Sequence, residues 1–279
     1  MGSCFSCLCN TIAVHVVLKL PHGHKGLLYN NGEFHPMDSV QDWVQSLYSV
    51  GWEGWAAYND ETSLTTKKTK GHCKGIVTWN KNKIGWLIHS VPNFPTEMTT
   101  TSISPILPSE LIYGQSFVYI ELPYSKEKLE SILKQIEWMD ANIFLNNNMI
   151  TPDSYFTTTG IKTMVISSSI SHHSKPSHYI MDIYGEHLCE LDSSTWYVET
   201  WRRGSPIQKT IPNLHDVKNL SWFAINYKES QDHSKWAVSN RYVWIGDLNR
   251  MESQMKRGGG GVVIRDSAMV KAFKGLIIN

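Results

Sequence analysis

The order of predicted elements in the first half of this chain recurs in its second half. In each half an apolar strand is followed by a helix and a second strand, and then by a His-x-Lys triplet and another strand. The second strand covers residues 55–59 upstream of His72 in one half, and residues 222–226 upstream of His233 in the other. The recurrence predicts an internal duplication into two halves of about 140 residues, an ordinary domain size. The predicted parts are a tail of residues 1–12, an N-terminal half of residues 13–150 and a C-terminal half of residues 151–279.

Apolar periodicity predicts strands and helices in both halves. Residues 14–20 form an apolar, β-branched run typical of a buried strand, whereas residues 127–139 carry apolar side chains at helical spacing. Another helix is predicted after Ser39, because a serine can cap its N-terminus. In the second half the predictions are strands at 161–170, 222–226 and 243–246, and helices at 179–191 and 266–277. This mixture predicts an α/β or α+β fold of packed layers.

The composition allows a large core and excludes a polybasic protein. Hydrophobic residues make up 41% of the chain and charged residues 18%, which argues against disorder. Lys plus Arg number 26 and Asp plus Glu number 25, so the formal net charge is +1. An anionic ligand would therefore have to bind at a local basic site, because the overall field of the protein is weak.

Two His-x-Lys triplets carry the clearest chemical signal, one with His72 and Lys74 and the other with His233 and Lys235. On a strand, residues i and i+2 point to the same face, so each triplet presents an imidazole beside an ammonium. The ammonium can bind a non-bridging phosphate oxygen, and the imidazole can attack phosphorus or transfer a proton. The triplets therefore predict phosphoryl chemistry. A third triplet, at residues 173–175, lies in a polar Ser/His stretch and is predicted to be a loop.

The residues after each triplet resemble the phospholipase D superfamily pattern, in which His-x-Lys is followed by an Asp and then by Gly-Ser-x-Asn. In the second half, Asn240 stands where that Asp usually lies. Asp247 stands where the Ser usually lies, and Asn249 matches the final Asn. In the first half, Trp79 stands at the Asp position, and residues 89–93 are a looser counterpart of the second motif. The match to this general pattern is degenerate.

A longer series of blocks resembles the deoxyribonuclease II family. The blocks run in family order across nearly the whole chain, and together they are a much stronger signal than each block alone. They are residues 17–21 (VLKLP), 71–75 (GHCKG), 87–95 (LIHSVPNFP), 113–115 (YGQ), 232–236 (DHSKW), 246–250 (GDLNR) and 257–260 (RGGG).

The resemblance implies a pseudo-dimer of two phospholipase-D-like halves with one active site between them. It implies a metal-independent DNA endonuclease without a cofactor, which leaves 3′-phosphate and 5′-hydroxyl ends through a phosphohistidine intermediate. His72 and His233 would be the nucleophile and the acid–base catalyst, in an order that the sequence leaves open. Lys74 and Lys235 would hold the phosphate in the transition state. The residues expected to bind or orient the phosphate are His89, Asn93, Asn240, Asp247 and Asn249.

The sequence departs from the family at features of secreted proteins. Family members usually carry a signal peptide and disulfides, and cysteines that they commonly have are here Ala237, Trp244 and Val263. These departures predict folding in a reducing compartment, the cytosol, where the protein would degrade stray DNA with little sequence preference. At neutral pH a catalytic His would need its pKa raised by a carboxylate such as Asp232 or Asp247. No carboxylate cluster or metal-ligand spacing of His and Cys is visible in the sequence, in agreement with a metal-free reaction.

The first six residues fit the pattern for N-myristoylation, with Gly2 as the acceptor. Cys4 and Cys7 could then take palmitate, the second anchor that stable membrane attachment requires. The alternative is an unmodified tail, because Met-Gly-Ser is also a common start in expression vectors. We therefore expect DNA as a partner, a peripheral membrane association that depends on acylation, and no obligate protein partner. The oligomeric state stays open.

Two other functions stay open on the sequence. A phospholipase-D-type lipid phosphodiesterase would use the same His-x-Lys pair, and acylation would place it at its substrate. A catalytically inactive DNA-binding relative is suggested by Trp79 and Asn240 at the positions of the superfamily Asp. Cleavage of DNA, of lipid or of neither distinguishes the three functions.

Overall fold

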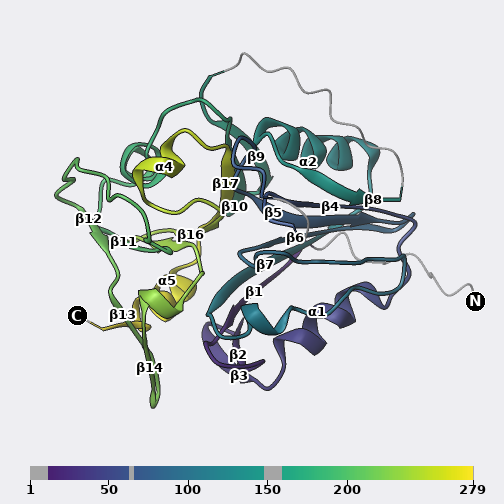
Figure 1. Ribbon diagram of the computed structural model, residues 1–279, viewed down its shortest axis with the longest axis horizontal. Helices are drawn as coiled ribbons and strands as arrows, with labels where there is room; N and C mark the ends of the chain where they lie inside the picture. Colours follow the sequence, from purple (N-terminus) through teal and green to yellow (C-terminus); the bar gives the residue numbers. More distant parts are fainter. Residues whose placement is uncertain (1–11, 63–65, 148–158, 279) are drawn as a thin grey trace, which may run out of the picture.

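The computed structural model describes residues 12–62, 66–147 and 159–278. Two large sheets dominate it, and each is built from one half of the chain (Figure 1). The first has eight strands in the order β3-β2-β1-β7-β6-β5-β4-β8, and the second has seven strands in the order β12-β11-β15-β16-β17-β10-β9. A small third sheet has the order β14-β13-β18. The predicted mixture of sheets and helices is therefore confirmed.

The first sheet is antiparallel throughout. Its strands are β1 (Ala13–Lys19), β2 (Gly26–Asn30), β3 (Glu33–Met37), β4 (Gly54–Asn59), β5 (Lys74–Trp79), β6 (Lys83–His89), β7 (Gln115–Pro123) and β8 (Ile143–Asn146). Helices α1 (Val40–Tyr48) and α2 (Lys126–Trp138) lie on opposite sides of it (Figure 1). Val17 packs in the apolar cluster under α1, whereas its neighbour Leu18 packs in the cluster under α2. This alternation follows from the period of two along a strand.

The second half supplies the other strands and the shorter helices. Its large sheet contains β9 (Lys162–Ser167), β10 (Ile170–Lys175), β11 (Trp196–Glu199), β12 (Leu214–Asp216), β15 (Trp236–Val238), β16 (Val243–Gly246) and β17 (Gly259–Ile264). The small sheet contains β13 (Asn219–Trp222), β14 (Ile225–Lys228) and β18 (Ile277–Ile278). The helices are a π-helical turn (Ile183–Leu188), α3 (Cys189–Leu191), α4 (Glu252–Met255) and α5 (Ser267–Lys274), and 3-10 turns lie at Pro108–Glu110 and Glu229–Gln231. None of the described helices is long and apolar enough to cross a membrane.

The two large sheets share a common core topology. The run β4-β5-β6-β7-β1 in the first sheet corresponds to β11-β15-β16-β17-β10 in the second, and every neighbouring pair in both runs is antiparallel. A helix follows the equivalent strands β7 and β17 in each half, α2 in one and α5 in the other. Each sheet thus has the chain order expected of a duplicated unit. The predicted boundary at residue 150 lies in the segment 148–158, outside the described residues, and stays a prediction.

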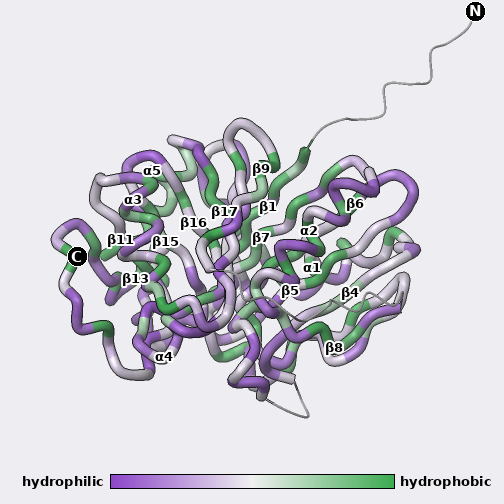
Figure 2. The backbone as a smooth tube through the Cα atoms, turned by 90° about the horizontal axis from the view of Figure 1, so that it is seen from above, coloured by the Kyte–Doolittle hydropathy of each residue, from purple (hydrophilic) through white to green (hydrophobic). Residues whose placement is uncertain are grey.

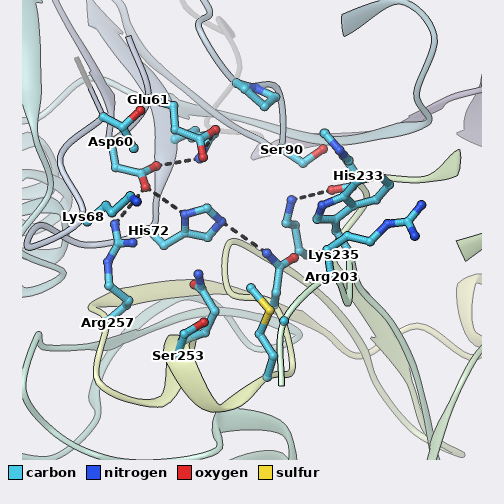
Figure 3. Close-up of a pocket in the computed structure, with 18 of the residues that line it drawn as sticks. Asp60, Glu61, Lys68, His72, Ser90, Arg203, His233, Lys235, Ser253 and Arg257 are labelled. Carbon is cyan, nitrogen blue, oxygen red and sulfur yellow. Dashed lines mark hydrogen bonds and ion pairs between the residues drawn. The ribbon is translucent and has the colours of Figure 1, made fainter. Parts of the chain in front are cut away.

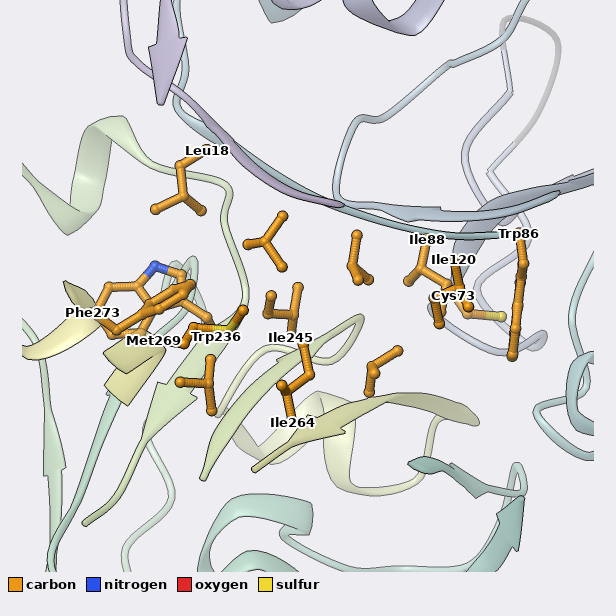
Figure 4. Close-up of a cluster of buried hydrophobic side chains, with 14 of the residues drawn as sticks. Leu18, Cys73, Trp86, Ile88, Ile120, Trp236, Ile245, Ile264, Met269 and Phe273 are labelled. Atoms are coloured by element: carbon orange, nitrogen blue, oxygen red, sulfur yellow. The ribbon is translucent and has the colours of Figure 1, made fainter. Parts of the chain in front are cut away.

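One apolar cluster joins the two halves. It contains Leu18 and Ile88 from the first sheet together with Trp236 and Ile245 from the second, and all four side chains are buried (Figure 4). Seen from above, the halves lie side by side, with β16 and β17 next to β7 and β1 (Figure 2). Because burial of apolar area contributes about 25 cal/mol per Å², a cluster of this kind holds the sheets together as one body.

Three local predictions are wrong. The third His-x-Lys triplet is not a loop but the end of β10, where the side chains of His173 and Lys175 are buried. Pairing with β9 and β17 on both sides satisfies its backbone, which the polar sequence did not indicate. Residues 222–226 contain the turn between β13 and β14 rather than one strand, with Phe223 at a positive φ of 49°. The helix predicted for 179–191 begins only at Ile183 and opens as a π-helical turn.

Candidate active site

A pocket of about 810 Å³ lies where the two halves meet. Both predicted His-x-Lys pairs line it, so His72, Lys74, His233 and Lys235 come together although they are far apart in the sequence (Figure 3). Other lining residues include Asp60, Glu61, Lys68, His178, Trp201, Arg203, Asn249, Lys256 and Arg257. The central expectation, one shared cleft between the halves, therefore agrees with the geometry.

Equivalent backbone bonds between the halves bring the two histidines into this pocket. The N–H of His72, just before β5, donates to the carbonyl of Gly258, just before β17 (2.7 Å). The N–H of His233, just before β15, donates to the carbonyl of Gly114, just before β7 (2.8 Å). A Cβ on Gly258 would overlap the carbonyl oxygen of Met139, so this close approach requires glycine. Each half thus holds the histidine of the other half.

The side chain of His72 is held by a carboxylate. Its Nδ1 lies 2.8 Å from Oδ2 of Asp60, and the same carboxylate accepts bonds from Lys74 Nζ (2.6 Å) and Arg257 (2.8 Å). Burial would raise the pKa of Asp60, but His72 and Lys74 outweigh it and hold that pKa well below its usual value. Asp60 is therefore ionised and accepts the Nδ1 proton. This leaves Nε2 of His72 facing Asn249, whose Nδ2 lies 3.5 Å away.

The side chain of His233 is held by aromatic rings instead. Tyr113 stacks on the imidazole with centroids 4.2 Å apart and planes at 8°, and Trp201 meets it edge to face at 4.0 Å. The nearest carboxylate oxygen, on Glu110, is 3.9 Å from Nδ1. Burial, and then the positive charges of Lys235 and Lys74, lower the pKa of His233 to about 2. The free enzyme therefore holds this imidazole neutral.

The two lysines differ in their electrostatic surroundings. Burial would lower the pKa of Lys74, but Asp60 and Glu61 outweigh it and raise that pKa. Lys235 donates to the carbonyl of its neighbour His233 (2.6 Å), and burial together with the charge of Lys74 lowers its pKa to about 8. Two ammonium groups in a buried pocket favour an anionic ligand such as a phosphodiester.

The other predicted phosphate ligands are placed unevenly. Asn249 lines the pocket. Asp247 is buried behind it, where its carboxylate accepts from the N–H groups of Lys74 (3.5 Å) and Gly260 (3.3 Å) and so connects the two halves. Burial raises the pKa of Asp247 to about 8. Asp232 likewise accepts from the N–H of Ser234. Neither carboxylate makes a hydrogen bond to His72 or His233, and burial lowers the pKa of both histidines, so the idea that these carboxylates raise a histidine pKa is wrong.

Like Asp247, three other predicted residues do not line the pocket. His89 is buried below it, accepts from the N–H of Val91 and packs against Phe94. Asn93 has a positive φ of 53°, and its N–H donates to the carbonyl of Glu61. Asn240 is exposed and accepts a bond from Lys274 Nζ (2.6 Å). The positions of these three side chains relative to the pocket depend on how the strands pair. The spacing of motif residues along the sequence does not indicate that pairing.

Several lining residues have no predicted role from the sequence. Asp60 and Glu61 follow directly after β4, and the pairing of β4 with β5 carries them to His72. Arg257 lies within one of the family-like blocks, and so does Tyr113, which stacks on His233 but does not line the pocket; the blocks were the available signal for both. Trp201 follows β11, which pairs with β15 beside His233. Only the pairing of strands distant in sequence places these residues.

Asp60, Glu61 and His72 have ligand atoms within 4.8 Å of one another, the spacing of a metal site. No such cluster is visible in the sequence. However, Asp60 already accepts from Lys74 and Arg257, whose positive charges would repel a cation. The residues present therefore suit an anion better than a metal ion.

The family model for deoxyribonuclease II matches residues 35–279. The chain belongs to the deoxyribonuclease II family. Cell-death-related nuclease 7 of Caenorhabditis elegans is 29% identical over 87% of this chain and 73% of its own length. Deoxyribonuclease-2-beta of Mus musculus is 28% identical over 84% of this chain and 74% of its own length, and deoxyribonuclease-2-alpha of Sus scrofa is 26% identical over 79% and 68%. The resemblance of the motif blocks is confirmed, and the protein is a hydrolase of the deoxyribonuclease II type.

Proposed function

We propose that this protein is a metal-independent DNA endonuclease that forms a phosphohistidine and leaves 3′-phosphate and 5′-hydroxyl ends. The observation that carries the proposal is the convergence of two imidazoles and two ammonium groups, one pair from each half, on a single pocket. Lys74 and Lys235 bind the non-bridging oxygens of the scissile phosphate, and Asn249 donates a further hydrogen bond. Positioned donors of this kind stabilise the charge that develops in the transition state.

In the proposed first step, His72 is the nucleophile. Its Nδ1–H is held by Asp60, so the lone pair of Nε2 attacks phosphorus. The imidazole becomes positively charged as the P–N bond forms, and the Asp60 carboxylate stabilises that charge. Burial lowers the pKa of His72 despite the opposing effect of Asp60, so the imidazole is neutral and able to attack.

His233 is the acid and then the base. As the P–O5′ bond breaks, protonated His233 donates its proton to the leaving 5′-oxygen, which gives the 5′-hydroxyl. In the second step, neutral His233 takes a proton from water, and the resulting hydroxide attacks phosphorus. The P–N bond breaks, the 3′-phosphate leaves, and His72 is restored. Acid–base catalysis of this kind contributes about 10²–10⁴-fold.

DNA is bound through its phosphates, with little dependence on sequence. Lys68, Arg203, Lys256 and Arg257 line the pocket beside the catalytic groups. Contacts from such residues to phosphate oxygens position a strand but carry no sequence information. Cleavage is therefore expected to be slowed by added salt and to be nearly uniform over different sequences.

Plasmid cleavage in EDTA tests this function. Wild-type protein is expected to nick and linearise plasmid in EDTA across acid to neutral pH, whereas His72→Ala and His233→Ala each abolish cleavage. His24→Ala is the matched control, because His24 is exposed and does not line the pocket. Cleavage that stops in EDTA, or that survives either catalytic substitution, would contradict the proposal. Phosphorylation of the products by polynucleotide kinase, without prior phosphatase treatment, checks for 5′-hydroxyl ends.

We further propose that the protein works in a reducing compartment, the cytosol, and removes stray DNA there. Ala237, Trp244 and Val263 stand where family members commonly carry cysteines, and their backbones pair in sequence across β15, β16 and β17. All three side chains are buried in one apolar cluster, so packing takes the place of a cross-link. Activity and unfolding temperature are expected to be unchanged by dithiothreitol, and fractionation of a tagged protein tests the compartment.

Acylation of the N-terminus is a separate part of this proposal. Gly2, Cys4 and Cys7 lie outside the described residues, and the proposal rests on their sequence pattern alone. Labelling of expressing cells with an alkyne myristate is expected to mark the wild-type protein but not Gly2→Ala. Equal labelling, or none in either, would remove the membrane tether from the proposal.

A further inference from the structure

The duplicated halves place different residues beside their two histidines. In the register of β4 and β5, Asn59 lies opposite Lys74, so Asp60 is the next residue along. In β11 and β15, Glu199 lies opposite Trp236, so the residue opposite Lys235 is Thr200 and the next one along is Trp201. The position that presents a carboxylate to His72 therefore presents an indole to His233.

A second pair of equivalent positions differs in the same way. Gly258 and Gly114 accept the equivalent bonds from His72 and His233, so the residues before them, Arg257 and Tyr113, correspond. Arg257 binds the carboxylate that holds His72, whereas Tyr113 stacks directly on His233. An ionic pair in one half is thus replaced by an aromatic pair in the other.

We propose that Tyr113 and Trp201 are positioning residues for the reaction, which hold the imidazole of His233 in place as the proton donor while Asp60 and Arg257 prepare His72 as the nucleophile. This inference rests on the proposed function. Neither imidazole nitrogen of His233 has a side-chain partner within 3.5 Å among the described residues, so the rings fix its orientation. Nε2 of His233 is buried and has no hydrogen-bond partner among the described residues, so no polar group competes with the rings in orienting the imidazole.

The charged groups around His233 explain why aromatic rings, rather than a carboxylate, orient this imidazole. Lys235, Lys74, His72 and Arg203 face it with positive or potentially positive charge, and Arg203 also lies over the Trp201 ring at 4.7 Å. Glu110 is the facing carboxylate, and burial raises its pKa. A carboxylate at hydrogen-bond distance would hold the proton on His233, whereas an aromatic pair orients the ring and lets the proton leave.

A substrate whose leaving group needs no proton separates this role from a structural one. Thymidine 3′-(4-nitrophenyl phosphate) releases 4-nitrophenolate, so the first step, which forms the phosphohistidine, requires His72 but no proton from His233. Hydrolysis of the phosphohistidine still uses His233 as a base, so the burst of 4-nitrophenolate in the first turnover is the quantity to measure. We expect Tyr113→Leu and Trp201→Leu to lose on the order of 10²-fold in kcat on DNA, with little change in KM, and to keep a nearly full rate of the first-turnover burst of 4-nitrophenolate. Tyr113→Phe keeps the stacked ring and is expected to retain most of the DNA activity.

Exchange of the indole for a carboxylate gives a second readout. Trp201→Asp places a carboxylate at the position equivalent to Asp60, so the fall of DNA activity with rising pH is expected to move to higher pH. The inference is overturned if the Leu variants lose kcat on DNA and the rate of the 4-nitrophenolate burst by the same factor, or if they cleave DNA like wild type. A wild-type protein that cleaves the nitrophenyl ester but not DNA also overturns it. One that cleaves neither overturns the proposed function itself.

Discussion

Asp60 links three positively charged or potentially charged side chains at the floor of the pocket. It accepts bonds from His72, Lys74 and Arg257 and is almost completely buried. A buried carboxylate is stable only with such partners, and it fixes the tautomer of the imidazole that it contacts. Its equivalent in the other half is Trp201, so the chemistry of the two histidines differs although their triplets match.

Asp60→Asn is expected to lower kcat on DNA by roughly 10²–10⁴-fold, because an amide cannot stabilise the positive charge that forms on His72. Steady-state cleavage of a labelled oligonucleotide measures the effect. Asp38→Asn is the matched control, because Asp38 is exposed and does not line the pocket. Equal kcat values for Asp60→Asn and wild type would rule out this role.

The value of kcat/KM on DNA is expected to fall as the pH rises from about 5 to about 8. Burial and the charge of Lys235 lower the pKa of His233 to about 2. Protonated His233, the proton donor, is therefore the minor form above that pH, and its fraction falls further as the pH rises. Burial lowers the pKa of His72 as well, despite the opposing charge of Asp60, which favours the neutral form of the nucleophile. A profile that is flat or rises toward pH 8 would show that His233 is not the proton donor.

At the scale of elements, the equivalent strands β1 and β10 each end in a buried lysine. Lys19 donates to the carbonyls of Leu20, Gly23 and Leu111. Lys175, the last residue of the third His-x-Lys triplet, donates to those of Tyr179 and Met255. Each lysine secures the loop of its own half that reaches the histidine of the other half. The third triplet therefore holds a loop, and the sequence pattern alone could not separate it from the two triplets that line the pocket.

Lys175→Met is expected to destabilise the protein by about 1–3 kcal/mol, because the carbonyls of Tyr179 and Met255 both lose the ammonium group that donates to them. Urea unfolding followed by tryptophan fluorescence measures this change. Lys209→Met is the control, since Lys209 is exposed. If both variants unfold at the same urea concentration as wild type, the loop does not depend on this lysine.

At the scale of the whole molecule, the active site exists only because the halves are docked. The apolar cluster between the sheets contains side chains from both halves of the chain. The backbone hydrogen bonds from His72 to Gly258 and from His233 to Gly114 cross the same interface. Both halves are therefore expected to unfold in one cooperative transition, with fluorescence and circular dichroism giving the same midpoint.

Gly258→Ala tests the docking directly. A Cβ there would overlap the carbonyl oxygen of Met139, so the expected cost is about 1–3 kcal/mol together with a loss of DNA cleavage as His72 shifts. Gly275→Ala is the control, because its Cβ would lie 3.3 Å from the nearest atom and its φ of −65° suits alanine. Normal cleavage by Gly258→Ala would show that the pocket tolerates movement at this interface.

The sequence by itself determined the local and repeated features. Some signals are carried by residues close together in the chain, so they could be predicted: the apolar run of β1, the cap of α1 at Ser39 and the two His-x-Lys triplets of the pocket. The order of the motif blocks was enough to indicate the family. The recurrence of elements indicated the duplicated strand order only in part, because the counterpart of β4 is β11 and not residues 222–226.

Only the tertiary structure decided what surrounds each histidine. Asp60 reaches His72, and Trp201 reaches His233, through pairing between strands that are separated in the chain. Asn240 matched a motif by spacing but points to Lys274, away from the pocket. The physical reason is that spacing along a chain sets which face of a strand a side chain takes, whereas contacts between strands depend on register and docking.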